Sequence, residues 1–195
     1  MRFIRQSASL NGGASTHSAL TDGEMMKYVK ILIAILGVAF LAVQFIRPAK
    51  NRSQAPPGSR MESGFHVPEH VMQVFRRSCY DCHSDSTVYP WYAEIQPVGW
   101  WLNSHIEDGK RHFDFDRFAS YRPMRQYGKF KDLVEQLQQD EMPLGSYLFI
   151  HRYARLTSDE KEEVIRWSGA MMDSMRARYP IDSLERNRTD ARNSR

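Results

Sequence analysis

The chain has 195 residues, of which 42% are apolar, and a formal net charge of +4. This apolar content is ordinary for a globular protein and is sufficient for a buried core. The basic residues are scattered rather than gathered into a stripe, which argues against nucleic acid as a partner.

The N-terminal part combines a polar segment with a long apolar one. Residues 1–27 are mostly polar and without pattern, and we expect a disordered tail there. Residues 28–46 carry no charge after Lys30, and as a helix they would be about 28 Å long, close to the thickness of the hydrocarbon core. A cleaved signal peptide would need a shorter apolar core and small residues at a cleavage site, whereas Phe45, Ile46 and Arg47 follow here. We therefore predict a transmembrane anchor in contact with the lipid bilayer.

Lysine and arginine flank this anchor on both sides, so that the positive-inside rule alone does not orient it. Residues 47–64 are rich in Pro, Gly, Ser and charge, which predicts an extended linker without a core of its own. We expect a folded domain over residues 65–179 and a second disordered tail over residues 180–195.

Within the domain, apolar residues recur at helical spacing, and no stretch alternates over the length of a strand. Pro68 and Pro97 can each open a helix, and residues 129–138 form a third. Thr157 followed by Glu160 is a capping box that begins the last helix. The fold class that we predict is all-α, with long loops between short helices.

The only two cysteines lie three apart in SCYDCHSD, residues 78–85, and His83 follows Cys82 directly. Two thiols on one helical turn, Cys79 and Cys82, can form thioethers to the vinyl groups of one porphyrin. The next residue, His83, can then bind the iron as its proximal ligand. This pattern favours one covalently attached haem c per chain.

Three other interpretations of this motif remain. A structural zinc site needs four ligands, and the chain has no second cysteine pair. A redox-active CxxC pair belongs at the start of a helix after a strand, and no such strand is predicted. A simple disulfide is compatible with an oxidising compartment, but it gives His83 no role.

A second iron ligand would decide what such a haem does. Met142, in EMPLGSY, lies 59 residues after His83, and Pro143 stiffens the loop behind it. A Met/His pair leaves no open iron position and implies electron transfer. His151 and His105 are the alternative distal ligands, whereas an empty position would imply peroxide or gas chemistry.

The longer run SCYDCHSDSTVYPWYAEIQPVGWWLNSHIEDGKRHFDF resembles the bacterial haem-binding domain family, small exported proteins with a single CxxCH. The segment EMPLGSYLFIHRYARLTSDEKEEVIRW is similar to the second conserved block of that family, and FIRPAKN after the membrane helix fits its usual N-terminus. The resemblance covers about residues 65–170.

This resemblance implies covalent haem at Cys79 and Cys82 with His83 as proximal ligand, in a cytochrome c-like, mainly helical domain that faces the periplasm. Met142 falls where the family carries Met-Pro, and His151 where it carries a histidine. Arg152 departs from the proline that often follows that histidine, which puts the shape of the local loop in doubt.

The sequence therefore predicts a membrane-anchored monohaem c-type cytochrome at the bacterial inner membrane, which transfers electrons in the periplasm to a redox partner near the membrane. The alternative is a haem-based sensor or a peroxidase-like protein with an open sixth iron position. A third possibility is an interaction module that holds a disulfide or zinc and no haem.

Overall fold

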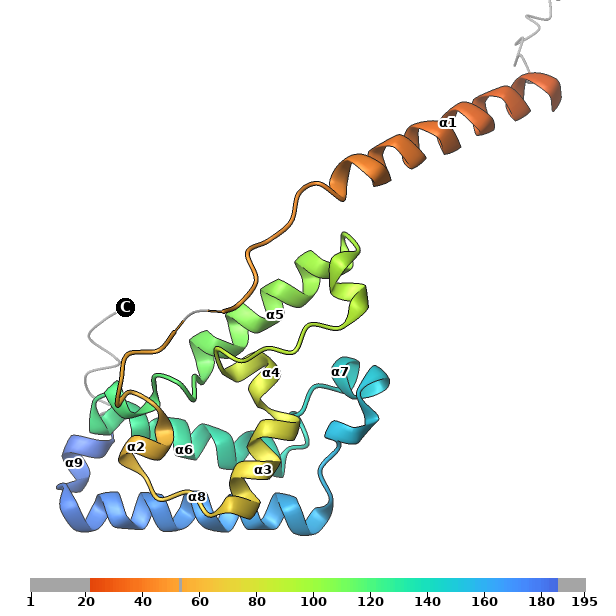
Figure 1. The fold of residues 1–195 in the computed structure, drawn as a ribbon. Coiled ribbons are helices and arrows are strands. Elements are labelled where there is room, and N and C mark those ends of the chain that lie inside the picture. Colours follow the sequence, from red (N-terminus) through yellow and green to blue (C-terminus); the bar gives the residue numbers. More distant parts are fainter. Residues whose placement is uncertain (1–21, 53, 186–195) are drawn as a thin grey trace, which may run out of the picture. The chain divides into compact units, whose positions relative to one another are not determined.

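The computed structural model describes residues 22–52 and 54–185 (Figure 1). The chain divides after Phe45 into two compact units. The first unit contains α1, Asp22–Val43, whose apolar side chains are exposed. Residues 23–43 of this helix are long and apolar enough to cross a membrane, with a mean hydropathy of 2.1.

The boundaries of α1 differ from those expected. The helix begins six residues before the predicted anchor and ends three residues before its predicted end. Residues 22–27 are therefore helical rather than a tail, because a helix propagates readily from an apolar segment into a polar turn. Glu24 near the helix N-terminus also suits the helix dipole. The rest of that predicted tail lies outside the described residues.

The second unit is built from helices. No strand occurs in residues 46–52 or 54–185, and the predicted all-α class is confirmed. The α-helices are α2 (Met61–Gly64), α3 (Glu69–Ser78), α4 (Tyr80–His83), α5 (Val98–His112), α6 (Pro123–Gln138), α7 (Gly145–Ile150), α8 (Ser158–Arg178) and α9 (Ile181–Leu184). Three short 3₁₀ helices join them: η1 (Trp91–Glu94), η2 (Phe118–Ser120) and η3 (Arg152–Ala154).

The helix starts follow local signals in the sequence. Pro68 and Pro97 are the N-caps of α3 and α5. The capping box of α8 is present, since the Thr157 side chain accepts from the Glu160 amide and the Glu160 carboxylate accepts from the Thr157 amide. The third helix begins earlier than predicted, at Pro123, which occupies a first-turn position that proline tolerates.

Aromatic side chains form much of the core where α3 and α6 each contact α8 (Figure 1). Phe118 packs on Phe130 with ring centroids 4.9 Å apart, and Phe130 packs edge-on against Trp167 at 5.5 Å. Phe75 of α3 meets Trp167 from the other side, also at 5.5 Å. These contacts fix the end of α3, the helix that leads into the CxxCH motif.

Residues 47–64 were predicted to form an extended linker without a core of its own, but the described part of this segment packs on the domain. Asn51 donates to the Ser84 carbonyl at 2.7 Å, and Ser59 donates to the Asp116 carbonyl at 2.6 Å. Met61 of α2 is fully buried in the core. The composition of the segment predicted a coil. The hydrogen bonds of Asn51 and Ser59 and the burial of Met61 instead hold it against the domain.

The predicted tail over residues 180–195 also differs. Residues 181–184 form α9, which packs on α6, and Leu184 is buried. One large apolar side chain with a site in the core is enough to dock this turn. Residues 186–195 lie outside the described part of the chain.

Arg77 of α3 and Glu160 of α8 form an ion pair between the two helices. Arg77 binds Glu160 with two contacts of 2.8 Å, and this pairing lowers the pKa of Glu160 to about 2. Because the pKa of Glu160 is lower in the folded than in the unfolded protein, the ion pair stabilises the fold at pH values above the ordinary carboxyl pKa. This stabilisation is lost as the pH falls through the folded-state pKa of Glu160.

We expect Glu160→Gln to lower the free energy of unfolding by about 1–2 kcal/mol at pH 7. The difference from the unsubstituted protein should be complete above about pH 5 and shrink toward zero near pH 2. Urea titrations across this range measure it. Asp173→Asn breaks the exposed Arg176–Asp173 pair on the same helix and should cost under about 0.5 kcal/mol. If the two substitutions lowered the free energy of unfolding equally, the stabilising role of the Arg77–Glu160 pair would be contradicted.

Candidate functional site

The CxxCH motif forms one turn of helix at the junction of α3 and α4. The amides of Cys82 and His83 both donate to the Cys79 carbonyl, at 3.2 and 3.0 Å. Both cysteines are free thiols. Burial is the largest cause of their raised pKa values, about 12 for Cys79 and about 11 for Cys82. A redox-active CxxC pair needs a low-pKa thiolate, and this buried pair does not supply one.

His83 is held in the orientation and protonation state of a metal ligand. Its Nδ1 lies 2.9 Å from the Phe113 carbonyl oxygen. Because a carbonyl only accepts, Nδ1 carries the proton and Nε2 keeps its lone pair. Burial lowers the pKa of His83, although the hydrogen bond to Phe113 acts in the opposite direction. The ring is therefore neutral at pH 7, which is the form that binds a metal.

The segment that follows α5 supports this histidine. The Phe115 amide donates to the His83 carbonyl at 2.8 Å. Two buried aspartates lie on the same segment, and the Asp85 amide donates to Asp116 at 2.6 Å. Arg60 pairs with Asp116 at 3.0 Å, and Lys110 pairs with Asp85. These bonds fix residues 113–116 beside α4, and with them the carbonyl that orients His83.

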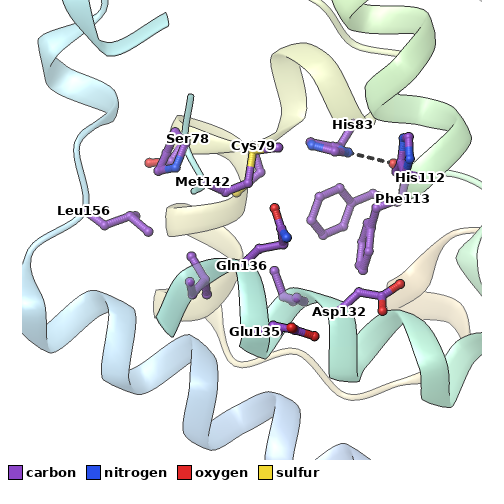
Figure 2. Close-up of a pocket in the computed structure, with 14 residues that line it drawn as sticks. Ser78, Cys79, His83, His112, Phe113, Asp132, Glu135, Gln136, Met142 and Leu156 are labelled. Atoms are coloured by element: carbon purple, nitrogen blue, oxygen red, sulfur yellow. Dashed lines mark hydrogen bonds between the residues drawn. The ribbon is translucent and has the colours of Figure 1, made fainter. Parts of the chain in front are cut away.

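A cavity of about 490 Å³ opens beside the motif (Figure 2). Its wall combines the end of α3, α4, the end of α5, the second half of α6, and the three loops that follow α5, α6 and η3. The lining includes Cys79, His83, Phe113, Phe115, Leu133, Leu137, Met142 and Leu156. A second cavity of about 380 Å³ shares Cys79, His83 and Met142 with the first and adds Cys82. Cavities of this size with mainly apolar walls are typical of sites for organic cofactors.

The structure brings Met142 to the same cavity as His83, although 59 residues separate them in the sequence. After α6 the chain turns at Asp140, whose φ of 57° is left-handed. Tyr147 of α7 then donates to the Asp81 carboxylate at 2.6 Å. This bond ties the loop that carries Met142 to the middle of the CxxCH turn.

The two histidine alternatives differ in position. His105 lines the second cavity, and its Nδ1 lies 2.9 Å from the Trp101 carbonyl. His151 lines neither cavity. Its Nε2 lies 2.7 Å from the Tyr92 hydroxyl and its Nδ1 lies 3.0 Å from the Tyr153 hydroxyl. Because both ring nitrogens of His151 are engaged, Met142 and His105 are the better placed candidates.

Sequence reasoning missed part of the lining. His112 is exposed, yet it lines both cavities, and its Nδ1 lies 2.9 Å from the Asp108 carbonyl oxygen. Gln136 and Leu137 of α6 also line the larger cavity, and Figure 2 shows Gln136 on its wall. The run HFDF, residues 112–115, was the available signal, since its alternation of aromatic and polar residues places both phenylalanines on the cavity wall.

Helix α5 approaches the motif closely at Gly109. A Cβ at this position would lie 2.7 Å from the Cys82 carbonyl oxygen and 3.3 Å from the Cys82 Cβ. Alanine there would force α5 away from α4, although alanine is otherwise the better helix former.

We expect Gly109→Ala to destabilise the domain by about 1–3 kcal/mol and to lower the amount of bound cofactor. Gly128→Ala in α6 is the matched control, since a Cβ there meets nothing within 4 Å; it should stabilise by about 0.5–1 kcal/mol. Urea unfolding of the two variants measures both values. If Gly109→Ala is as stable as Gly128→Ala, the close contact between α5 and α4 does not exist.

Comparison with known proteins bears on what this cavity holds. A family model described as a haem-binding domain matches residues 38–170, more than half of the chain. The protein is thus a haem-binding protein, and the chain belongs to the haem-binding domain family. No curated protein and no solved structure matches it. The apolar cavity and the neutral His83 fit haem as the cofactor.

Proposed function

We propose that the protein is a membrane-anchored monohaem c-type cytochrome that transfers electrons in the periplasm. One observation carries the proposal: Cys79, His83 and Met142 face one mainly apolar cavity, with Nδ1 of His83 engaged and Nε2 left as a ligand atom. When bound, haem supplies a one-electron iron couple, ferric to ferrous.

Each residue of the site has a distinct role in this proposal. The Sγ atoms of Cys79 and Cys82 would hold the porphyrin through thioethers, and Nε2 of His83 would bind the iron. Met142 would supply the second iron ligand, and its thioether sulfur would raise the reduction potential. The apolar wall, including Phe113 and Leu137, excludes water from the iron and favours the less charged ferrous state.

The location follows from the same chemistry. A haem that is bound through thioethers cannot be lost to the medium, which suits a domain outside the cytoplasm. The apolar helix α1 then anchors the chain in the bacterial inner membrane with the C-terminal unit in the periplasm. Anchoring keeps the domain near redox partners in or beside the membrane.

Reaction with carbon monoxide distinguishes electron transfer from the alternative of an open sixth iron position. The full chain, matured in cells with cytochrome c assembly proteins, should give a low-spin ferrous spectrum that carbon monoxide leaves unchanged. It should also titrate reversibly as a one-electron couple. A high-spin spectrum that shifts on addition of carbon monoxide would reject the electron carrier and support a sensor or peroxidase-like protein.

A further inference from the structure

Three of the four tryptophans in the chain are on the surface of adjoining elements. Trp167 is in the core and 7% exposed, whereas Trp91 of η1 is 77% exposed. Trp100 and Trp101 of α5 are 36% and 48% exposed. With two exposed aliphatic neighbours they form what we call the η1–α5 surface: Trp91, Ile95, Val98, Trp100 and Trp101.

The backbone of this surface is tightly packed. A Cβ at Gly99 would lie 2.4 Å from the Ala93 carbonyl oxygen, so η1 and the first turn of α5 are in close contact. Gln96 between them is buried, and its side-chain oxygen accepts from the Trp100 amide at 3.0 Å. The buried amide of Gln96 thus has a partner within this packing, while the apolar side chains of the η1–α5 surface are exposed, an arrangement typical of an interaction site.

This surface lies where the chain enters the domain. The indole Nε1 of Trp100 donates to the Ile46 carbonyl at 2.7 Å. Only Gln44 and Phe45 separate Ile46 from Val43, the last residue of α1. Because three peptide units span at most about 10 Å, Ile46 cannot be further than this from the end of α1, whatever the angle between the two units.

The charge beside the η1–α5 surface points to a lipid membrane as the partner of this surface. Glu94 of η1 pairs with both Arg47 and Lys50, at 3.0 and 2.5 Å. Two cations to one carboxylate leave a positive balance next to the tryptophans. Tryptophan is enriched at the membrane–water interface, and juxtamembrane basic residues are attracted to anionic headgroups.

We propose that the η1–α5 surface inserts into the headgroup region of the bilayer and holds the domain on the membrane. The inference rests on the proposed function in one respect, that α1 is a membrane anchor. None of the five residues lines either cavity, so contact with lipid through this surface leaves the haem site available to a redox partner.

Photolabelling of the full chain in vesicles tests this. The vesicles contain phosphatidylethanolamine, phosphatidylglycerol and a lipid that carries a diazirine near its headgroup, and mass spectrometry locates the label. We expect label on α1 and on peptides of the η1–α5 surface. Phe149 and Ile150 of α7 and Tyr153 of η3 are 79%, 57% and 60% exposed, and they should stay unlabelled as an internal control.

Substitution sharpens the test. The double variant Trp91→Gln, Trp101→Gln should lower labelling at Ile95 and Val98 at least about fivefold, because less apolar area remains to be buried. Labelling of α1 should not change, and Phe149→Gln should have no effect at either place.

The labelling results distinguish membrane contact of the η1–α5 surface from anchoring by α1. Label on α1 alone would overturn the η1–α5 inference and support the anchor, whereas no label at all would overturn both. Equal label on the η1–α5 surface and around Phe149 would also overturn it, since contact would then not be specific. The visible spectrum of the same sample reports on haem independently.

Discussion

The double variant Cys79→Ala, Cys82→Ala should lose all haem that survives denaturation, because these are the only thiols in the chain. The mainly apolar cavity and His83 remain in this variant, and we expect some haem to bind reversibly. Haem staining of a denaturing gel measures the covalent fraction, and the visible spectrum of the native protein measures the total.

The single variants act as graded controls for this result. Cys79→Ala or Cys82→Ala leaves one thioether and should shift the reduced α-band, since one vinyl group then stays unsaturated. Covalent haem in the double variant would show that the attachment site lies elsewhere. The zinc or disulfide interpretation would gain support if even the unsubstituted protein, matured with assembly proteins, took up no haem.

Met142→Ala should change the iron centre without detaching haem. Loss of the thioether ligand should remove the weak ferric absorption band at about 695 nm. It should also lower the midpoint potential by about 100 mV or more. It should also open the sixth position, so that ferrous protein binds carbon monoxide. Optical spectroscopy and potentiometric titration measure these changes.

Two other side chains provide the comparison for Met142. Met124 of α6 is 39% exposed and lines neither cavity, and Met124→Ala should leave the band and the potential unchanged. His105 lines the second cavity, so loss of low-spin character in His105→Ala, but not in Met142→Ala, would assign the distal position to His105 instead.

The helices and the chemistry of the motif were open to prediction because their signals are local. A proline or a capping box sets a helix start within one turn, as Pro97 and Thr157 do. The spacing of Cys79, Cys82 and His83 is the one that covalent haem attachment requires, so this hypothesis depends on no distant residue.

What could not be predicted depends on tertiary contacts. The packing of residues 47–52 and 54–64 rests on hydrogen bonds of Asn51 and Ser59 to groups far along the chain. The place of His112 on the cavity wall depends on how the end of α5 meets α4, and Gly109 sets that distance. His151 and Met142 both lie far from the motif in the sequence and only nine positions from each other, and only the fold places one of them, Met142, on the cavity.

The intact mass of the denatured full chain, matured with cytochrome c assembly proteins, tests the central claim most directly. The account predicts a polypeptide heavier by the mass of one haem, with the added mass on the peptide that contains Cys79 and Cys82. A mass equal to that of the bare polypeptide, or lower by two hydrogens as in a disulfide, would contradict it.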